Sequence, residues 1–140
     1  MDSATLWGTL IMAAPAHKIP GPDHPISIQP TLDRVVVKFA GEVIADSTRA
    51  LTLREAQYPP VQYIPRGDVR MDRLVRTQHG THCPYKGDAS YFTIKAGERT
   101  AENAVWSYEK PFDAVGEIAD HVAFYPDRVD SVEIVSAAPK

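Results

Sequence analysis

The sequence predicts a mainly β fold in one compact domain, either a β barrel or a tent-like β sandwich of about eight short strands with one short α-helix. Three observations carry this prediction. Runs rich in β-branched and aromatic residues recur at intervals of about ten residues. The chain has 12 prolines, and they stand between these runs, where turns belong. Clear helical periodicity is confined to one segment, Pro111–Asp120.

The strongest hairpin signal is the β-branched run Arg34–Phe39, which Ala40-Gly41 joins to the alternating segment Glu42–Ser47. Before it, four prolines in Ile19–Pro30 forbid a helix and favour an extended lead-in. The six further segments with strand composition or alternation are Arg49–Arg54, Tyr58–Ile64, Ser90–Lys95, Asn103–Tyr108, His121–Tyr125 and Ser131–Val135.

Pro59-Pro60 makes its segment an edge strand or a bend, because proline cannot donate to a sheet ladder. Asp68–Leu74 is predicted to form one helical turn with Asp68 as its N-cap. In the predicted α-helix, Phe112, Val115 and Ile118 recur at helical spacing and form its apolar side.

Length and composition fit one folded domain. The chain has 140 residues, of which 44% are hydrophobic and 24% charged, so a sizeable core can form and disorder is excluded. We expect a single β domain over residues 19–136, a flexible N-terminal extension over 1–18 and a C-terminal tail over 137–140.

Charge and cysteine content exclude several classes. The net charge is −3 without a Lys/Arg block, which argues against a nucleic-acid partner. One cysteine excludes an internal disulfide framework and a multi-cysteine zinc site. The first residues lack both the basic region of a signal peptide and the roughly 20 apolar residues of a membrane span. The expectation is a cytoplasmic protein without a membrane partner.

The densest group of reactive side chains lies in Thr81–Tyr91, which holds a thiol, an imidazole, an ammonium and a carboxylate. Proline and glycine punctuate the segment, so we interpret it as a loop, and loops on a rigid β scaffold are where binding residues collect.

Five motifs in this order resemble the bacterial domain-of-unknown-function family four-two-seven, which also carries a nucleotidyltransferase label. The motifs are Asp23-His24-Pro25-Ile26, Pro65-Arg66 with Asp68-Val69, Thr81-x-Cys83-Pro84-Tyr85-Lys86-Gly87 with Tyr91, Ala104-x-Trp106-x-Tyr108, and Val122-Ala123-Phe124-Tyr125. The resemblance covers about residues 19–136 and implies a small, mainly β domain without a firmly defined activity. The chain has neither a Gly-Ser pair followed by paired aspartates nor a P-loop, which separates it from well-defined nucleotidyltransferases.

The leading functional prediction is a polar, aromatic-walled pocket for a small anionic molecule. Arg66 and Lys86 would bind the anion, since a guanidinium pairs with carboxylate or phosphate oxygens and an ammonium adds a point charge. Asp68 and Asp88 would orient these cations, or hold Mg²⁺ if a nucleotide binds. The tyrosines that would shape the pocket are Tyr85, Tyr91 and Tyr108. The alternative is a structural network in which Arg66 pairs with one of the two aspartates.

Aromatic residues in the last third of the chain are further candidates. Trp106 and Tyr108 lie two apart, so on a strand they share one face, where they could stack a planar ligand together with Phe124 and Tyr125. The alternative is that they belong to the core with their polar ends satisfied. Tyr108 and Tyr125 are the stronger pocket candidates.

If the protein is an enzyme, Cys83 or His82 is the predicted catalytic residue, as nucleophile or general acid/base. Neighbours on a strand point to opposite faces, so His82 is a poor base for Cys83, and His79 or His121 would serve instead. The alternative for Cys83 is a buried small hydrophobe. The same alternation argues against His82 and Cys83 sharing a metal ion, although a metal-binding protein remains an alternative function.

A third alternative is a non-catalytic binding or interaction module. In that case the apolar walls of the pocket would serve as a contact surface, for instance in a homodimer. The sequence identifies no cofactor.

Overall fold

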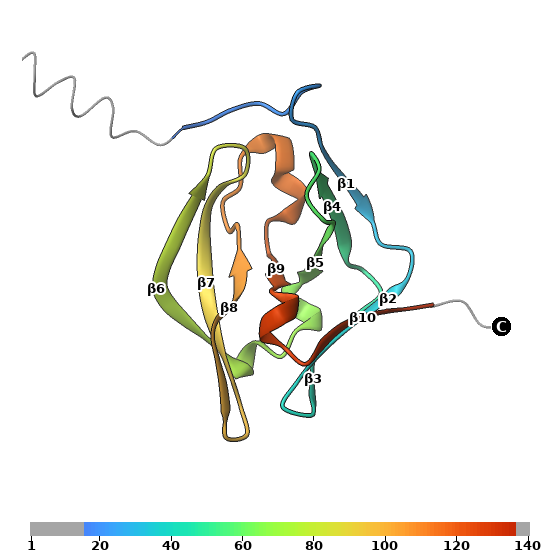
Figure 1. The fold of residues 1–140 in the computed structure, drawn as a ribbon, viewed down its shortest axis with the longest axis vertical. Coiled ribbons are helices and arrows are strands. Elements are labelled where there is room, and N and C mark those ends of the chain that lie inside the picture. The colour runs from blue at the N-terminus through green and yellow to red at the C-terminus, as the bar shows by residue number, and fades with distance from the viewer. Residues whose placement is uncertain (1–15, 137–140) are drawn as a thin grey trace, which may run out of the picture.

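The computed structural model describes residues 16–136, which form ten β-strands in two antiparallel sheets and a few short 3₁₀ turns. Figure 1 shows the two sheets as one compact body. Most of the predicted N-terminal extension and all of the predicted tail lie outside the described residues. Among residues 16–136, no helix has the length and apolar character needed to cross a bilayer.

The larger sheet has seven strands. In spatial order they are β1 (Ile26–Pro30), β4 (Leu51–Glu55), β5 (Val61–Pro65), β9 (His121–Phe124), β8 (Arg99–Ser107), β7 (Gly87–Ala96) and β6 (Leu74–Cys83). The smaller sheet has the order β10 (Ser131–Val135), β2 (Arg34–Phe39) and β3 (Glu42–Ser47).

The seven-stranded sheet narrows at β9, which pairs at only two positions with each of its neighbours, β5 and β8. Strands β5 and β9 pair at only two positions, Ile64 with Val122 and Pro65 with His121. Beyond this short ladder the β1-β4-β5 half and the β6-β7-β8 half diverge like the sides of a tent (Figure 1). The sandwich predicted from the sequence is therefore confirmed, and the sheet does not close into a barrel because β1 and β6 remain edges.

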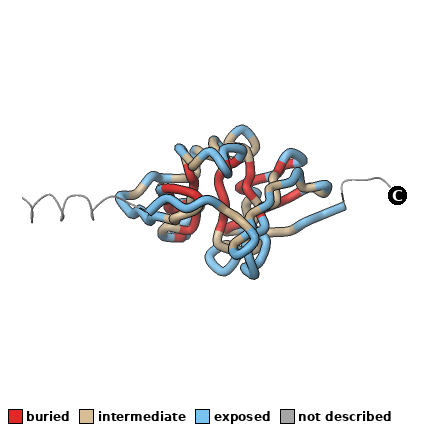
Figure 2. The backbone as a smooth tube through the Cα atoms, turned by 90° about the horizontal axis from the view of Figure 1, so that it is seen from above, coloured by how far each residue is buried: buried red, intermediate tan, exposed pale blue. Residues whose placement is uncertain are grey.

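Two apolar clusters hold the sheets together, and buried residues run through the middle of the molecule in Figure 2. The first cluster packs β2 and β3 against β7 and β8, with Val35, Phe39 and Ile94 nearly inaccessible to solvent. The second lies between the two halves of the larger sheet and includes Tyr63 and Tyr108. This second cluster is rich in tyrosine, and it forms the surroundings of the site described below.

The hairpin of β2 and β3 has the predicted bounds. Ala40 and Gly41 both have positive φ, 54° and 75°, as the two central residues of a type I′ turn require. This turn matches the right-handed twist of the flanking strands, which is why a two-residue loop suffices.

Strand β6 is absent from the sequence prediction, and β1 lies within the segment that the sequence predicts only as an extended lead-in. Strand β6 is mostly exposed and polar, with a burial pattern in which most residues face solvent. Its structure comes from pairing with β7, so neither composition nor periodicity indicates it. The predicted loop Thr81–Tyr91 is consequently the end of β6, a tight turn and the start of β7.

The predicted helix is present as a 3₁₀ helix, Asp113–Ile118, rather than an α-helix, and it is kinked at Val115 (φ −126°). Its two buried residues, Val115 and Ile118, are three apart, a spacing that a helix of three residues per turn satisfies as well as an α-helix does. Residues Arg66–Asp68 and Met71–Arg73 form two further 3₁₀ turns, with Pro65 and Arg70 at their N-cap positions. The prediction of Asp68 as an N-cap is therefore wrong.

Candidate functional site

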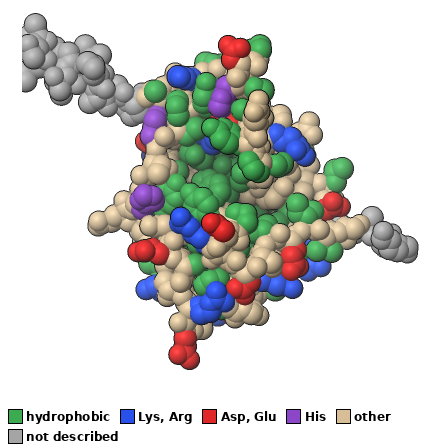
Figure 3. All heavy atoms as spheres, in the orientation of Figure 1, with side chains coloured by type: hydrophobic (Ala, Val, Ile, Leu, Met, Phe, Trp, Pro, Cys, Tyr) green, Lys and Arg blue, Asp and Glu red, His purple; other side chains and the backbone are tan. Residues whose placement is uncertain are grey.

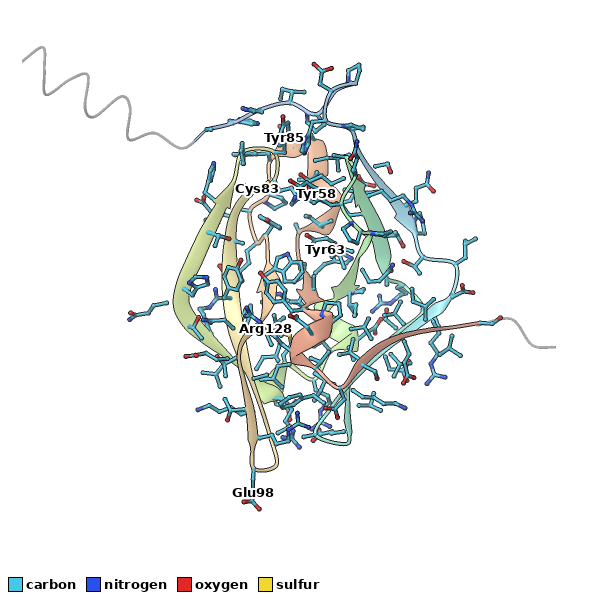
Figure 4. All side chains as sticks on the ribbon, viewed as in Figure 1. Tyr58, Tyr63, Cys83, Tyr85, Glu98 and Arg128 are labelled. Carbon is cyan, nitrogen blue, oxygen red and sulfur yellow. The ribbon has the colours of Figure 1, made fainter. Side chains whose placement is uncertain are left out.

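A cavity of about 180 Å³ opens between the two halves of the larger sheet. Six aromatic side chains form its walls: Tyr58, Tyr63, Tyr91, Trp106, Tyr108 and Tyr125. Lys86 and Glu55 supply its charged groups. In Figure 3 hydrophobic side chains gather at the centre of this face, and Figure 4 shows Tyr58 and Tyr63 in the opening.

The charged end of the cavity is a chain of three side chains. Lys86, only 8% exposed, donates a hydrogen bond from Nζ to Oε1 of Glu55. The other carboxylate oxygen of Glu55 lies 2.7 Å from Nε2 of His24. His24 in turn stacks on Tyr85, with ring centroids 3.9 Å apart. An ammonium and a carboxylate, both largely removed from water, thus border an aromatic-walled space.

Local structure explains how Lys86 comes to lie there. It occupies the turn between β6 and β7, where its N–H bonds to the carbonyl of Cys83 and its carbonyl accepts from the N–H of Phe112. Gly87 follows with φ 111°, a conformation that side-chain-bearing residues rarely adopt. These constraints direct the lysine inward, with Nζ 5.7 Å from the centroid of the Tyr108 ring.

Burial and ion pairing act in opposite directions on Glu55. Burial raises the pKa of its carboxyl, but hydrogen bonds from Lys86 and His24 outweigh burial and leave the pKa below its ordinary value. Glu55 is therefore ionised at neutral pH, and its charge is balanced by that of Lys86.

Three of the phenols around the cavity stay neutral far above physiological pH. Burial raises the pKa of Tyr63 and of Tyr108 well above the ordinary value, and burial with a hydrogen bond to Tyr91 raises that of Tyr125 to about 12. Trp106 Nε1 donates to the hydroxyl of Tyr63 over 3.2 Å. Tyr63, Tyr108 and Tyr125 therefore offer neutral hydroxyls and ring faces, and the charged residues of the lining are Lys86 and Glu55.

Because the pKa values of these phenols are raised in the folded state, we expect the protein to lose stability in alkali. A folded-state pKa raised above the unfolded value contributes stability below the unfolded pKa and loses it as pH rises. We expect the melting temperature to fall from about pH 10, and Tyr125→Phe to remove part of this decline. Melting curves from pH 8 to 12 test it, and an identical slope in the variant would contradict the assignment to Tyr125.

The structure brings part of the predicted pocket together. Lys86, Tyr91 and Tyr108 line the cavity, joined by Tyr125, which the sequence also suggested. Tyr85 is not among the lining residues and instead stacks on His24. Of the other two aromatic candidates, Trp106 lines the cavity as well, whereas Phe124 belongs to the first core cluster.

Arg66, the second predicted anion-binding residue, lies elsewhere. It donates a hydrogen bond to Glu109 over 2.7 Å and packs against the ring of Phe92. Its Nε is buried without a hydrogen bond, 3.9 Å from a carboxylate oxygen of the exposed Asp120. Arg66 is not among the residues that line the cavity beside Lys86.

The two predicted aspartates are also apart from the cavity and from Arg66. Asp68 accepts hydrogen bonds from Ser47 and Arg49, and this Arg49 hydrogen bond is the main reason for its lowered pKa. Asp88 lies 2.6 Å from Nδ1 of His82 on the outer face of the β6-β7 ladder. Each aspartate thus has a local partner that the sequence did not indicate.

Cys83 and His82 face opposite sides of β6. Cys83 is partly buried and packs against the second core cluster, whereas His82 binds Asp88 and the carbonyl of Ala16 on the exposed side. The hydrogen bond to Asp88 is the main reason that the pKa of His82 is raised. Their catalytic roles remain predictions.

The histidines predicted as alternative bases, His79 and His121, do not converge on Cys83. His79 packs edge-on against Tyr91, and Nδ1 of His121 lies 2.7 Å from the carbonyl of Ala119. Within residues 16–136, three or more His, Cys, Asp or Glu side chains nowhere gather as a metal site would require.

Sequence reasoning missed Glu55, the partner of Lys86. A signal was present, because Leu51, Leu53 and Glu55 alternate along one strand, and the predicted strand ended one residue too early. Because side chains two apart on a strand share one face, the Glu55 carboxylate lies on the same face as the two leucines. His24 was noticed only as part of a motif, since its role depends on contacts with residues 31 and 61 positions away.

The fold and the cavity define a small β-sandwich domain with a buried ion pair under aromatic walls. Residues 27–134 match the family described as Domain of unknown function (DUF427). The chain therefore belongs to this family, as its five motifs suggested. Comparison with curated proteins gives no significant match.

Proposed function

We propose that the domain binds a small molecule that combines a planar ring with an anionic group, and that the anion contacts Lys86. The observation that carries this proposal is the nearly buried ammonium at the charged end of an aromatic-walled cavity. Cavities that take small ligands combine apolar and aromatic walls with a few convergent polar groups.

The Lys86 ammonium has donors to spare. It carries three N–H groups, of which Glu55 engages one in the structure. A carboxylate or phosphate oxygen at the cavity end would accept another. Glu55 opposes this binding because its negative charge lies beside the same ammonium, so it sets the affinity for anions and favours ligands that also donate a hydrogen bond.

The aromatic walls supply the remaining contacts. Trp106 and Tyr125 lie with ring centroids 4.5 Å apart, and Tyr63 meets Trp106 edge to face. Ring faces of this kind suit a flat ligand body. Nucleotidyl transfer, catalysis by Cys83 or His82, a homodimer and a cytoplasmic location remain predictions that this binding function does not require.

A melting-shift screen of the wild-type protein against nucleotides, sugar phosphates and aromatic carboxylates tests the proposal. A compound at a hundred times its dissociation constant adds about 2.7 kcal/mol of stability, which a melting curve resolves readily. Compounds that produce a shift are then titrated against Glu55→Gln. Because this change removes the competing charge and keeps the side-chain shape, we expect anions to bind several-fold more tightly.

Glu98→Gln is the matched control, since Glu98 lies exposed at the tip of the β7-β8 hairpin, far from the cavity (Figure 4). Its anion affinity should equal that of the wild type. Absence of any stabilising anion, or weaker anion binding in Glu55→Gln, would refute the proposed role of Lys86.

A further inference from the structure

A second cavity of about 340 Å³ adjoins the first. It lies by the seam between β5 and β9, where the two halves of the larger sheet begin to diverge. Its lining is almost entirely apolar and includes Val37, Ile64, Phe124, Pro126 and Val132. Gln62 contributes an amide whose oxygen already accepts hydrogen bonds from Thr31 and Thr52.

The two cavities share one wall. Tyr58, Pro59, Val61 and Trp106 line both of them. Most of this wall is the segment that leads into β5, and Tyr58 is 66% exposed within it. Pro59 and Pro60 have no N–H with which to anchor the segment. The partition between the cavities is thus one chain segment and one indole ring.

Size and polarity suggest a single elongated site. Ligand cavities usually measure about 300–1,000 Å³, and the first cavity alone, at about 180 Å³, falls short of this range. The combined volume of the two cavities lies within this range. One end then offers the Lys86–Glu55 pair and the other offers an apolar surface.

We infer that the two cavities form one site for an amphipathic ligand, whose anionic head contacts Lys86 and whose apolar tail passes Trp106 into the second cavity. This inference rests on the anion contact with Lys86 in the proposed function, and it adds an apolar tail to the ligand. It assigns a role to Val132 and its neighbours, which border the second cavity without touching the ion pair.

Chain length is the direct test. Calorimetric titration of the full chain with hexanoate, decanoate and decanol compares a short acid, a long acid and a long neutral chain. Each buried methylene tightens binding about fourfold. With four additional methylenes, decanoate should bind at least tenfold more tightly than hexanoate, and more tightly than decanol.

Val132→Phe fills the second cavity and should abolish the advantage of decanoate while leaving hexanoate affinity unchanged. Val135→Phe, on the same strand but outside this cavity's lining, is the matched control and should behave as the wild type. If Val132→Phe fails to fold, Pro60→Phe blocks the same cavity from an exposed position.

The outcomes separate the two proposals. Equal affinity for the two acids, or a chain-length advantage that persists in the blocked variant, would overturn the elongated site and leave the proposed function intact. If neither acid binds, or if decanol binds as tightly as decanoate, the elongated site with its anionic head at Lys86 is overturned, whereas the proposed function is decided separately by the melting-shift screen with ring-bearing anions.

Discussion

Replacing Lys86 by methionine should lower the free energy of unfolding by about 3 kcal/mol, among the largest effects of any single change near the cavity. Methionine keeps an unbranched, apolar side chain of similar length, but Glu55 is left as a nearly buried carboxylate with only His24 as partner. Removing one member of a buried ion pair is more costly than removing both, because the remaining charge is no longer compensated. Chemical denaturation at pH 7 measures the loss.

Two further variants separate the ion pair from a general effect of the substitution. The double variant Lys86→Met with Glu55→Gln should recover most of the lost stability, since it leaves no unpaired charge. Lys95→Met, at an exposed position on β7, should change stability by less than about 0.5 kcal/mol. A double variant as unstable as Lys86→Met alone would show that the pair is not the cause.

Glu109→Gln should lower the free energy of unfolding by about 2 kcal/mol at pH 7. Glu109 accepts hydrogen bonds from Arg66, from both terminal nitrogens of Arg76 and from Ser90, all between 2.7 and 2.9 Å. These contacts join the end of β5 to strands β6 and β7. The Arg76 hydrogen bonds are the main reason that the pKa of Glu109 lies near 2.

The pH dependence of this effect has a definite sign. A carboxyl whose pKa is lowered in the folded state stabilises the fold above its unfolded pKa, and this stabilisation is lost as pH falls through the folded value. The difference in the free energy of unfolding between wild type and Glu109→Gln should therefore have its full size above about pH 5 and vanish near pH 2. A difference that stays constant over this range would contradict the ionic origin, and Glu98→Gln is again the control.

The β2-β3 hairpin illustrates what a sequence can specify locally. A β-branched run, an Ala-Gly turn and an alternating run are contiguous, and the turn fixes the register of the first pairs, whereas a β-bulge between Val37 and Lys38 shifts the register of the rest. Pro111–Asp120 was recognised as helical for a similar local reason, but spacing of three could not distinguish a 3₁₀ helix from an α-helix. Strand β6 has no local signal, because its polar residues are held by cross-strand bonds to β7.

The residues of the site also divide into those that local sequence identifies and those whose place depends on the fold. Lys86, Tyr91 and Tyr108 were identified by their chemistry within motifs, and the cavity contains all three. Arg66 was placed with them on chemistry alone, yet the structure pairs it with Glu109, 43 residues away along the chain. An arginine pairs with the carboxylate that lies close to it in the folded chain. Because this sequence contains 18 acidic residues, the sequence alone does not identify that partner.

By itself, the sequence determined the mainly β class, the family and the side chains that we propose for anion binding, because turn residues, strand periods and motifs are local properties. Only the tertiary structure decided that Glu55 neutralises Lys86, that Arg66 lies outside the cavity and that a second cavity adjoins the first. The physical reason is that ion pairs and cavities form between strands distant in sequence, where the two-pair ladder of β5 and β9 lets the sheet open.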